Sequence, residues 1–186
     1  KTDLVFFTDM AQAYKAKAST FDDTKASVMG DFIPAKLSFD ENENLTAMFP
    51  TTDYSGYMMF FFENGKAAKV PMKAYETKTN RKKLAKAYSA KSPLIAAIFI
   101  SDDCDILLRS STGHALVFNT AMILPKTTRD SQGVQVMTMR KKGILASAAI
   151  ITDEEREGLE KYRSKSVPAA GKPAKELGET NQLTFE

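Results

Sequence analysis

The sequence predicts an all-β protein of four-stranded sheets, or blades, arranged radially as in propeller-like folds. Three observations support this fold class. The apolar runs up to residue 151 are short, rich in Phe, Ile, Val and Met, and separated by polar turns, which is typical of strands. A hairpin pattern recurs at intervals of about 50 residues, the usual length of a four-stranded blade. With 43% hydrophobic and 26% charged residues, the chain can bury a core.

The repeated unit begins with an apolar strand, a turn and a second strand. Its copies are DLVFFTDMAQAYKAKASTF (3–21), YMMFFFENGKAAKVPMKAY (57–75) and DILLRSSTGHALVFNTAMI (105–123), and they end on the bulky residues Phe21, Tyr75 and Ile123. The turns fall at Met10-Ala11, Asn64-Gly65 and Thr112-Gly113. Asn-Gly is the favoured two-residue hairpin turn, because both of its residues must accept positive φ. Each unit therefore contains a β-hairpin.

Each hairpin is followed by a polar loop and a further strand. These strands are LTAMF from residue 45, LIAAIFI from 94 and ILASAAII from 144. The stretch DENEN at 40–44 imitates the opening of a calcium loop, but Leu45 and Thr51 occupy the positions that require Gly and Glu, so a hairpin turn is the better interpretation. We expect blades over residues 1–151, with repeats near 3–50, 57–100 and 105–151. About three to four blades would form.

The chain beyond residue 151 has a different character. Residues 153–165 follow a Thr152 cap, carry acids in the first turn and carry Lys and Arg near the end, which predicts a short helix. Residues 167–175 contain Pro168, Gly171 and Pro173 and are interpreted as a flexible linker. The final QLTFE is a candidate for one more strand. We therefore expect residues 152–186 to form a helix, a linker and a C-terminal tail.

Positive charge is unevenly distributed, although the net charge is only +3. Lys78 to Lys86, KTNRKKLAK, has five cations and no acid. Such a run is often only a solvated loop, but here cations recur at corresponding places in the repeats. Since phosphates give affinity and base edges give specificity, cations distributed along blade edges predict sequence-independent binding of duplex DNA. The candidate DNA-binding residues are Lys15, Lys17, Lys25, Lys66, Lys69, Lys73, Lys78, Arg81, Lys82, Lys83, Lys126, Arg129, Arg140 and Lys141.

No catalytic or metal site is predicted, and no cofactor. His114 has no second His, Cys or paired carboxylate at ligand spacing. Cys104 stands among Asp102, Asp103 and Asp105, which would raise a thiol pKa. Neither GxxxxGK[ST] nor GxGxxG occurs. A lone cysteine indicates a reducing compartment, and the longest apolar runs are too short to cross a membrane.

The hairpins FFTDMAQAYK and FFFENGKAAKVPMKAY, the KTNRKK loop, and TTRDSQGVQVMTMRKKG at 127–143 together resemble the C-terminal domain of the bacterial DNA gyrase and topoisomerase IV A subunits. The resemblance covers roughly residues 2–151. It implies a β-pinwheel, in which propeller-like blades exchange strands with their neighbours and duplex DNA bends around a basic rim. It also implies a bacterial cytoplasmic protein associated with the nucleoid. Its expected partners are duplex DNA, the remainder of the A subunit, plus the ATPase B subunit.

In the resembled ATP-dependent enzymes, DNA is cleaved by a tyrosine that follows an arginine in a separate upstream domain. No tyrosine here follows an arginine, so we expect this piece to have no cleavage activity of its own. TRDSQGVQV keeps one glycine, Gly133, but is not the glycine- and arginine-rich heptapeptide of gyrase, and the choice between a gyrase-type and a topoisomerase IV-type subunit stays open. Lys1 at the start suggests a fragment of a longer chain.

Two functions are compatible with the sequence. The first is a non-catalytic domain that bends or wraps duplex DNA and presents it to a type IIA topoisomerase core. Within it, the acidic stretch 153–186 could compete with DNA for the rim. The alternative is a propeller-like protein-interaction module with an incidental basic loop.

Overall fold

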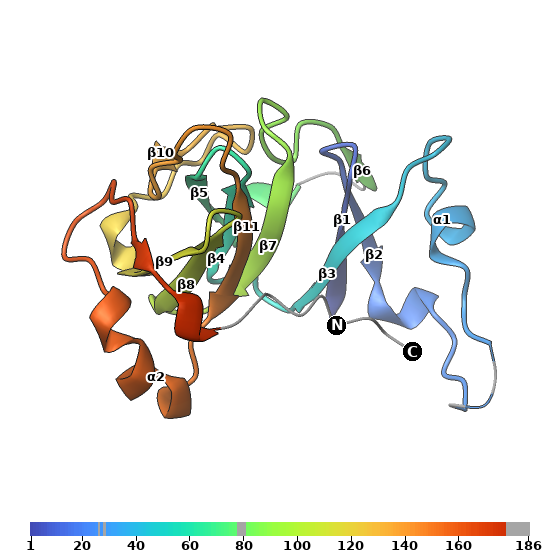
Figure 1. Ribbon diagram of the computed structural model, residues 1–186. Coiled ribbons are helices and arrows are strands. Elements are labelled where there is room, and N and C mark those ends of the chain that lie inside the picture. The colour runs from blue at the N-terminus through green and yellow to red at the C-terminus, as the bar shows by residue number, and fades with distance from the viewer. Residues whose placement is uncertain (26, 28, 78–80, 178–186) are drawn as a thin grey trace.

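The computed structural model describes residues 1–25, 27, 29–77 and 81–177. Its strands form three four-stranded antiparallel sheets, called blades 1, 2 and 3 (Figure 1). In blade 1 the order is β3 (Leu45–Thr51), β1 (Asp3–Thr8), β2 (Ala13–Lys17) and β6 (Lys83–Leu84). In blade 2 it is β7 (Leu94–Ile100), β4 (Tyr57–Phe62), β5 (Lys66–Pro71) and β10 (Val134–Gln135). In blade 3 it is β11 (Leu145–Ile150), β8 (Asp105–Ser110), β9 (His114–Asn119) and β12 (Lys172–Pro173). The predicted all-β fold is confirmed.

Two cores lie between successive blades. Side chains alternate between the two faces of a strand, so one strand can serve two cores. Phe60 and Phe62 of β4 pack against Val5 and Phe7 of β1, with Phe7 and Phe60 rings 5.5 Å apart. On the other face of β4, Met59 and Phe61 pack against Ile106 and Leu108 of β8. Blade 2 is therefore buried on both faces, which explains its almost continuous apolar run.

The hairpin turns differ in one respect from the expected geometry. Positive φ occurs at Ala11 (53°), Gly65 (81°) and Gly113 (79°), the second residue of each predicted turn, whereas the first residue keeps negative φ. The turns are therefore not of the type that requires positive φ at both residues. The requirement is strict at Gly65, where an added Cβ would lie 2.0 Å from the Met137 carbonyl oxygen.

The outer strand of each blade comes from a later part of the chain. After the β4–β5 hairpin the chain returns to blade 1 as β6, and after β8–β9 it returns to blade 2 as β10. In each case, a backbone N–H of the returning segment donates to the carbonyl of the second turn residue. The donors are Ala87 N to Ala11 O (2.8 Å), Val136 N to Gly65 O (3.0 Å) and Ala174 N to Gly113 O (2.9 Å). This strand exchange is the defining feature of a pinwheel.

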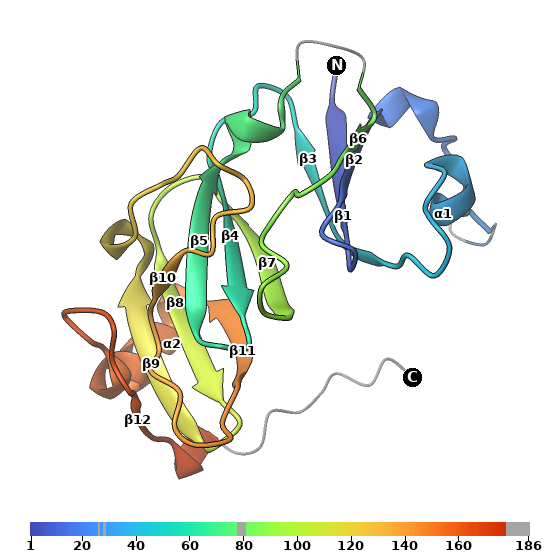
Figure 2. The same ribbon diagram turned by 90° about the horizontal axis from the view of Figure 1, so that it is seen from above.

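The blades share a common inner side. The edge strands β3, β7 and β11 lie close to one another, whereas β6, β10 and β12 lie on the opposite, outer edges (Figure 2). Some of the predicted cations are therefore on outer edges: Arg81, Lys82 and Lys83 around β6, and Lys126 and Arg129 before β10.

Further segments cover the two ends of the stack. On blade 1, η1 (Ala18–Thr20) and α1 (Ile33–Lys36) belong to a segment that brings Phe21 to 5.7 Å from Phe6 and Phe39 to 4.7 Å from Tyr14, measured between ring centroids. Short 3-10 turns η2 (Met72–Tyr75) and η3 (Thr120–Met122) follow the hairpins of blades 2 and 3. Among the described residues, no helix combines the length and apolar character needed to cross a bilayer.

The predicted C-terminal helix is present, but the predicted linker is not. Thr152 caps α2 (Asp153–Leu159) by accepting from the Glu155 N–H at 3.3 Å, and η4 (Glu160–Tyr162) continues it. Residues 167–175 do not hang free: they include β12, which pairs with β9 as the fourth strand of blade 3, before η5 (Lys175–Leu177). The Pro and Gly content suggested flexibility, but edge strands tolerate proline, and Gly171 has φ of 75° where an added Cβ would approach Ala115 O. QLTFE lies outside the described residues.

Candidate nucleic-acid interface

A basic cleft of about 590 Å³ opens on the outer edge of blade 1. It lies between β2, the chain just after α1, and the segment that leads into β6. Its lining residues are Asp3, Tyr14, Lys15, Ala16, Lys17, Thr20, Lys36, Leu37, Ser38, Thr77, Arg81, Lys82 and Lys83. Asp3 is the only acid among them. The cleft thus brings together cations that are far apart in the sequence.

The backbone of the exchanged strand fixes the cationic loop in this cleft. The Lys15 N–H donates to Lys82 O at 2.8 Å, and Tyr14 and Ala13 pair with Lys83 and Leu84. Leu84 is buried in the core between blades 1 and 2, which anchors the segment. Arg81, Lys82 and Lys83 are exposed beside it.

Lys15 is held more tightly than the other cations of the cleft. Its Nζ donates to Thr77 Oγ1 at 2.6 Å and lies 5.8 Å from the centre of the Tyr54 ring. Burial lowers the pKa of Lys15, while Asp3 and Glu76 oppose that shift. The side chain is half-buried, so it can reach only a ligand that enters the cleft.

Several cations of the cleft already have acidic partners. Lys17 pairs with Asp3, Lys36 with Asp31 at 3.3 Å and Lys83 with Asp40 at 2.8 Å. In the described part of the chain, Arg81 and Lys82 form no side-chain ion pair or hydrogen bond. The positive charge of the cleft that has no acidic partner therefore comes mainly from exposed Arg81 and Lys82. Half-buried Lys15 adds to it.

Lys36 was missed as a candidate because it stands alone in the sequence, outside the hairpin repeats. Its position follows from α1, a single helical turn with Pro34 near its start, and its Nζ lies 5.5 Å from the centre of the Phe21 ring. The Ile-Pro pair could have indicated a helical turn at this place, but not its position beside β2.

Lys69 requires a correction. A phosphate contact needs an exposed ammonium group, but the Lys69 side chain is only 5% exposed. Its Nζ lies 2.7 Å from Asp103 Oδ1, 3.3 Å from Thr120 O and 4.8 Å from the centre of the Tyr57 ring. Lys69 occupies the hairpin position equivalent to Lys15, but it forms an internal ion pair and does not belong to the interface.

The other predicted residues are dispersed. Lys73 is exposed and pairs with Glu76 at 2.7 Å, Lys66 is half-buried at the start of β5, and Lys25 is exposed between η1 and α1. Arg129 donates through Nη1 to Ala74 O at 3.1 Å and lines a shallow hollow with Lys86, near the exposed Lys126. Arg140 and Lys141 are exposed in the loop between β10 and β11. Lys78 lies outside the described residues.

The residues considered for chemistry occupy structural positions. His114 Nδ1 is 3.3 Å from Thr112 O in the β8–β9 turn. Burial raises the pKa of Cys104, and Asp105 and Asp103 add to this shift. Within residues 1–25, 27, 29–77 and 81–177, no group of three or more His, Cys, Asp or Glu side chains is placed to hold a metal ion.

In sequence, the chain is similar to part of the A subunit of bacterial DNA gyrase. The chain is 26% identical to the A subunit of DNA gyrase from Streptomyces coelicolor over 156 residues and 25% identical to that of a Nocardioides species over 187 residues. These matches cover 80% and 98% of the chain but only 18% and 20% of the relatives, so the chain spans about a fifth of their length. No protein-family model matches.

Solved structures show the same fold. The C-terminal domain of DNA topoisomerase IV matches with a TM-score of 0.72 and 21% identity, over 83% of this chain and 49% of that one. The E. coli ParC C-terminal domain matches with a TM-score of 0.72 and 14% identity, over 95% of this chain and 78% of that one. Together with the three strand-exchanged blades, these matches show that the chain has the β-pinwheel fold of the topoisomerase IV and ParC C-terminal domains.

Proposed function

We propose that this domain binds duplex DNA through its phosphate groups and bends or guides the duplex toward the cleavage core of a type IIA topoisomerase. The observation that carries the proposal is the cleft on blade 1, where Lys15, Arg81 and Lys82 converge without ion-pair partners among the described residues. The domain would contribute binding and geometry, and no catalytic step.

The kind of contact follows from the side chains available. Arg and Lys on a strand edge bind phosphate oxygens, which carry no sequence information. Reading bases in the major groove usually requires a helix or a β-ribbon that enters the groove. Here α1 has four residues, and α2 carries Asp153, Glu154 and Glu155 in its first turn, which would repel the backbone. Binding should therefore tolerate any sequence.

Bending follows if the duplex contacts more than one outer edge. Because β3, β7 and β11 converge on the inner side, the outer edges of neighbouring blades point in different directions. Smooth bending of a 20–30 base-pair duplex by 40–90° costs about 1–6 kcal/mol, which several phosphate contacts can offset. Lys126 and Arg129, which precede β10, would supply contacts on blade 2.

The names of the relatives suggest the larger assembly. A gyrase or topoisomerase IV A subunit would supply the rest of the chain, and an ATPase B subunit would complete the enzyme. We therefore propose that the domain acts in the bacterial cytoplasm, at the nucleoid.

The test is duplex binding by a variant of the cleft. Arg81→Glu/Lys82→Glu changes the two cations that have no acidic partner among the described residues and leaves Lys83 with Asp40. Fluorescence anisotropy with a labelled duplex of about 40 base pairs should show at least about tenfold weaker binding at about 100 mM salt. The slope of log affinity against log salt should fall by about two, one for each lost phosphate contact.

A control variant carries the same change in charge elsewhere. Lys165→Glu/Lys175→Glu alters two exposed lysines of the C-terminal segment and should reduce affinity much less. Equal losses in the two variants would show a general effect of net charge. Absence of duplex binding by the wild-type domain at low salt would refute the proposal and favour a protein-interaction module.

A further inference from the structure

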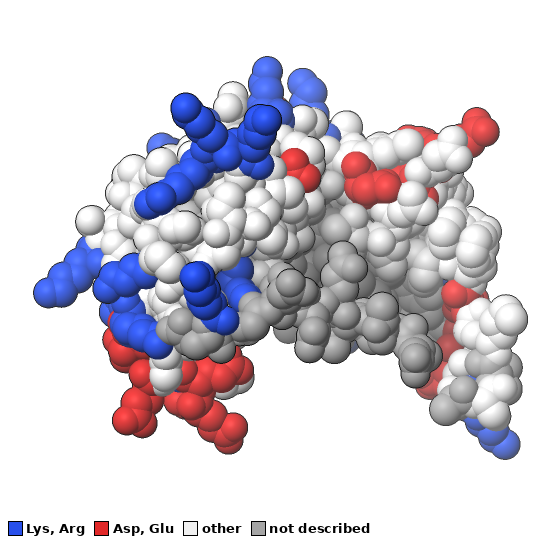
Figure 3. Space-filling view, viewed as in Figure 1, with Lys and Arg blue, Asp and Glu red and all other residues white. Residues whose placement is uncertain are grey.

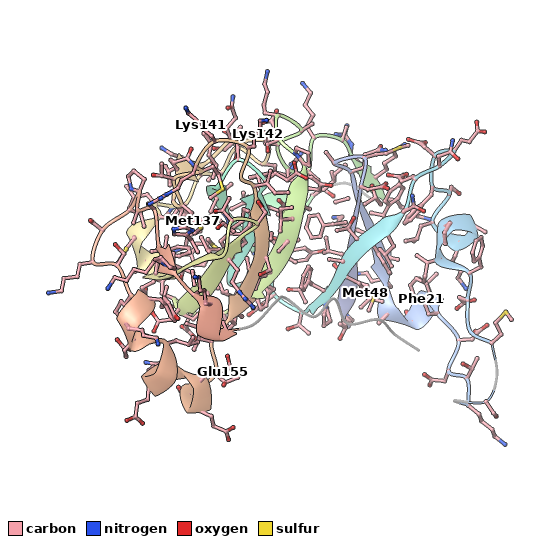
Figure 4. The ribbon with its side chains drawn as sticks, viewed as in Figure 1. Phe21, Met48, Met137, Lys141, Lys142 and Glu155 are labelled. Atoms are coloured by element: carbon pink, nitrogen blue, oxygen red, sulfur yellow. The ribbon has the colours of Figure 1, made fainter. Side chains whose placement is uncertain are left out.

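We infer that the end of the pinwheel formed by loops 85–93 and 136–144 is a second DNA-backbone surface, separate from the cleft on blade 1. The inference rests on the proposed function, because it assigns a further stretch of duplex to this end. The exposed cations of the surface, called the end surface below, are Lys86, Lys91, Arg140, Lys141 and Lys142. Figure 3 shows Lys and Arg gathered at the top of the molecule, where Figure 4 labels Lys141 and Lys142.

The two loops occupy equivalent places in blades 2 and 3. Loop 85–93 joins β6 to β7, and loop 136–144 joins β10 to β11, so each follows an exchanged outer strand and leads into an inner strand. Neither contains an acidic residue. In the described part of the chain, no ion pair or side-chain hydrogen bond occupies the five cations. Half-buried Glu63, in the β4–β5 turn, is an acid that also lies near this end.

Buried residues hold the backbone of loop 85–93 that carries Lys86 and Lys91. Ala87, Tyr88 and Ser89 are buried. The Ala87 carbonyl accepts from Tyr75 OH at 2.7 Å, and the Tyr88 ring stacks on Phe60 at 5.2 Å. Lys86 and Lys91 flank these anchors and are exposed.

Loop 136–144 is fixed in a similar way. Val136 and Met137 are buried, and both N–H groups donate to Gly65 O, at 3.0 and 3.1 Å. The Gly143 N–H donates to Arg140 O at 2.8 Å, which closes a turn with Arg140, Lys141 and Lys142 at its tip. Preordered cations lose less conformational entropy on binding than flexible ones.

Blade 1 has the same backbone at this place but the opposite charge. Asp40, Glu41 and Asn42 precede β3 at the same distance at which Arg140, Lys141 and Lys142 precede β11. Asn42 (φ 61°) and Lys142 (φ 59°) even share the left-handed conformation. Figure 3 shows acidic side chains at the top right, on the side of blade 1. The positive end surface therefore covers blades 2 and 3 and stops at blade 1.

A phosphate backbone is the occupant that best fits this surface. The surface is cationic and extends over blade ends, although Lys86 also lines the shallow hollow beside Arg129, and such an extended surface suits a long polyanion better than a small one. The opposite end of blade 3 carries acidic α2, where Figure 4 places Glu155 far from Lys141 and Lys142. Of the two ends of blade 3, the end with Lys141 and Lys142 would therefore attract a duplex, and the end with acidic α2 would repel it.

The test uses Arg140→Glu/Lys141→Glu with the same labelled duplex. We expect about three- to tenfold weaker binding at about 100 mM salt and a salt slope lower by about two. Lysine acetylation with and without duplex, read by mass spectrometry, should show protection of Lys86, Lys91 and Lys142 in the wild-type domain. Lys142→Gly is a second variant: it removes a cation where φ is positive, so it should bind DNA less tightly while folding at least as well.

The outcomes separate this inference from the proposed function. Affinity within about twofold of wild type for the end-surface variants, together with a roughly tenfold loss for Arg81→Glu/Lys82→Glu, would overturn the end surface and leave the proposed function standing. A loss in Lys165→Glu/Lys175→Glu as large as in the end-surface variant would also overturn it. If Arg81→Glu/Lys82→Glu and the end-surface variants all bind duplex like wild type, both surfaces are overturned, whereas absence of duplex binding by the wild-type domain refutes the proposed function itself.

Discussion

Lys83 and Asp40 form a close ion pair beside the cleft: Lys83 Nζ lies 2.9 Å from Oδ1 and 2.8 Å from Oδ2 of Asp40. Asp40 also accepts from Gln12 Nε2 at 2.9 Å. Its loop is held by buried Glu43, whose Oε1 accepts from the Asp40 N–H at 2.9 Å and from Tyr14 OH at 2.5 Å. Burial and Glu43 raise the pKa of Tyr14 to about 12, so this donor stays protonated at neutral pH. Asp40 therefore already neutralises Lys83, and under the proposed function it would compete with a DNA phosphate for this ammonium group.

The first prediction concerns this competition. Asp40→Asn should tighten duplex binding about two- to fivefold, because it frees Lys83 and removes a negative charge beside the proposed path. The gain should shrink as salt rises. Anisotropy titrations at about 50 and about 200 mM salt measure both effects. Unchanged or weaker binding, with an unchanged melting temperature, would mean that Lys83 does not touch DNA.

The second prediction concerns the exchanged strand. Gly65→Ala should lower the free energy of unfolding by about 2–4 kcal/mol, because φ is 81° and the new Cβ would meet the Met137 carbonyl oxygen. Denaturant unfolding measures the change. Gly158→Ala in α2 is the matched control: nothing lies within 4 Å of its Cβ, so this helix position should be neutral or slightly stabilised. Similar losses at both sites would contradict the steric argument.

The third prediction separates Lys69 from the interface. Lys69→Met should leave duplex affinity unchanged, because the ammonium is buried against Asp103 and Thr120. Asp103→Asn should cost about 1–3 kcal/mol in unfolding free energy, since it leaves a buried ammonium without its counter-charge. Lys69→Met should cost less, because the remaining Asp103 is 42% exposed and can be hydrated. A loss of DNA affinity in Lys69→Met would return Lys69 to the interface.

The fourth prediction concerns pH. Asp105 accepts two hydrogen bonds from Arg163, at 3.0 and 2.8 Å, and these bonds lower the pKa of Asp105 below its usual value despite opposing burial. A lowered folded-state pKa gives stability that is present above the unfolded pKa, about 3.9, and is lost as pH falls through the folded value. Asp105→Asn should therefore lower the melting temperature at about pH 7, and the gap to wild type should narrow below about pH 4.

The control for the pH prediction is Glu154→Gln, an exposed carboxylate on α2. It removes the same charge but should leave the melting curve close to wild type at every pH. A gap for Asp105→Asn that stays constant from about pH 7 to about pH 3 would show that the Asp105–Arg163 pair is not the source of the acid sensitivity.

The hairpins were predictable from sequence because their signals are local. The apolar runs around Phe7, Phe61 and Leu108 and the small turn residues mark strand pairs that need no distant information. The helix after Thr152 was predictable for the same reason. Strand exchange is not local: β6 and β12 are two residues long, and nothing in the sequence near Leu84 or Lys172 specifies a partner strand. The pairing of these two strands depends on how the blades are placed next to one another in the folded protein.

The candidate site shows the same limit. The run Arg81 to Lys83 was visible because its charges are consecutive, but Lys36 reaches the cleft only through a segment that folds back over blade 1. Lys69 and Lys15 occupy the same hairpin position, and only the packing of Asp103 and Thr120 buries one of them. Charge can be read from a sequence, whereas the partner that neutralises it usually cannot.

The borrowed outer strand has a consequence for how such arrays change length. The unit from β4 to β7 donates β6 to the sheet before it and receives β10 from the unit after it. Deleting residues 57–104 would remove β6, the partner of β2, and β5, the partner of β10. Strand β10 could then pair with β2, and every remaining sheet would keep its outer strand. We therefore expect that whole units of this kind can be gained or lost during evolution without leaving an unpaired sheet edge. A deletion that ends within a hairpin would instead disrupt the sheets of two neighbouring units.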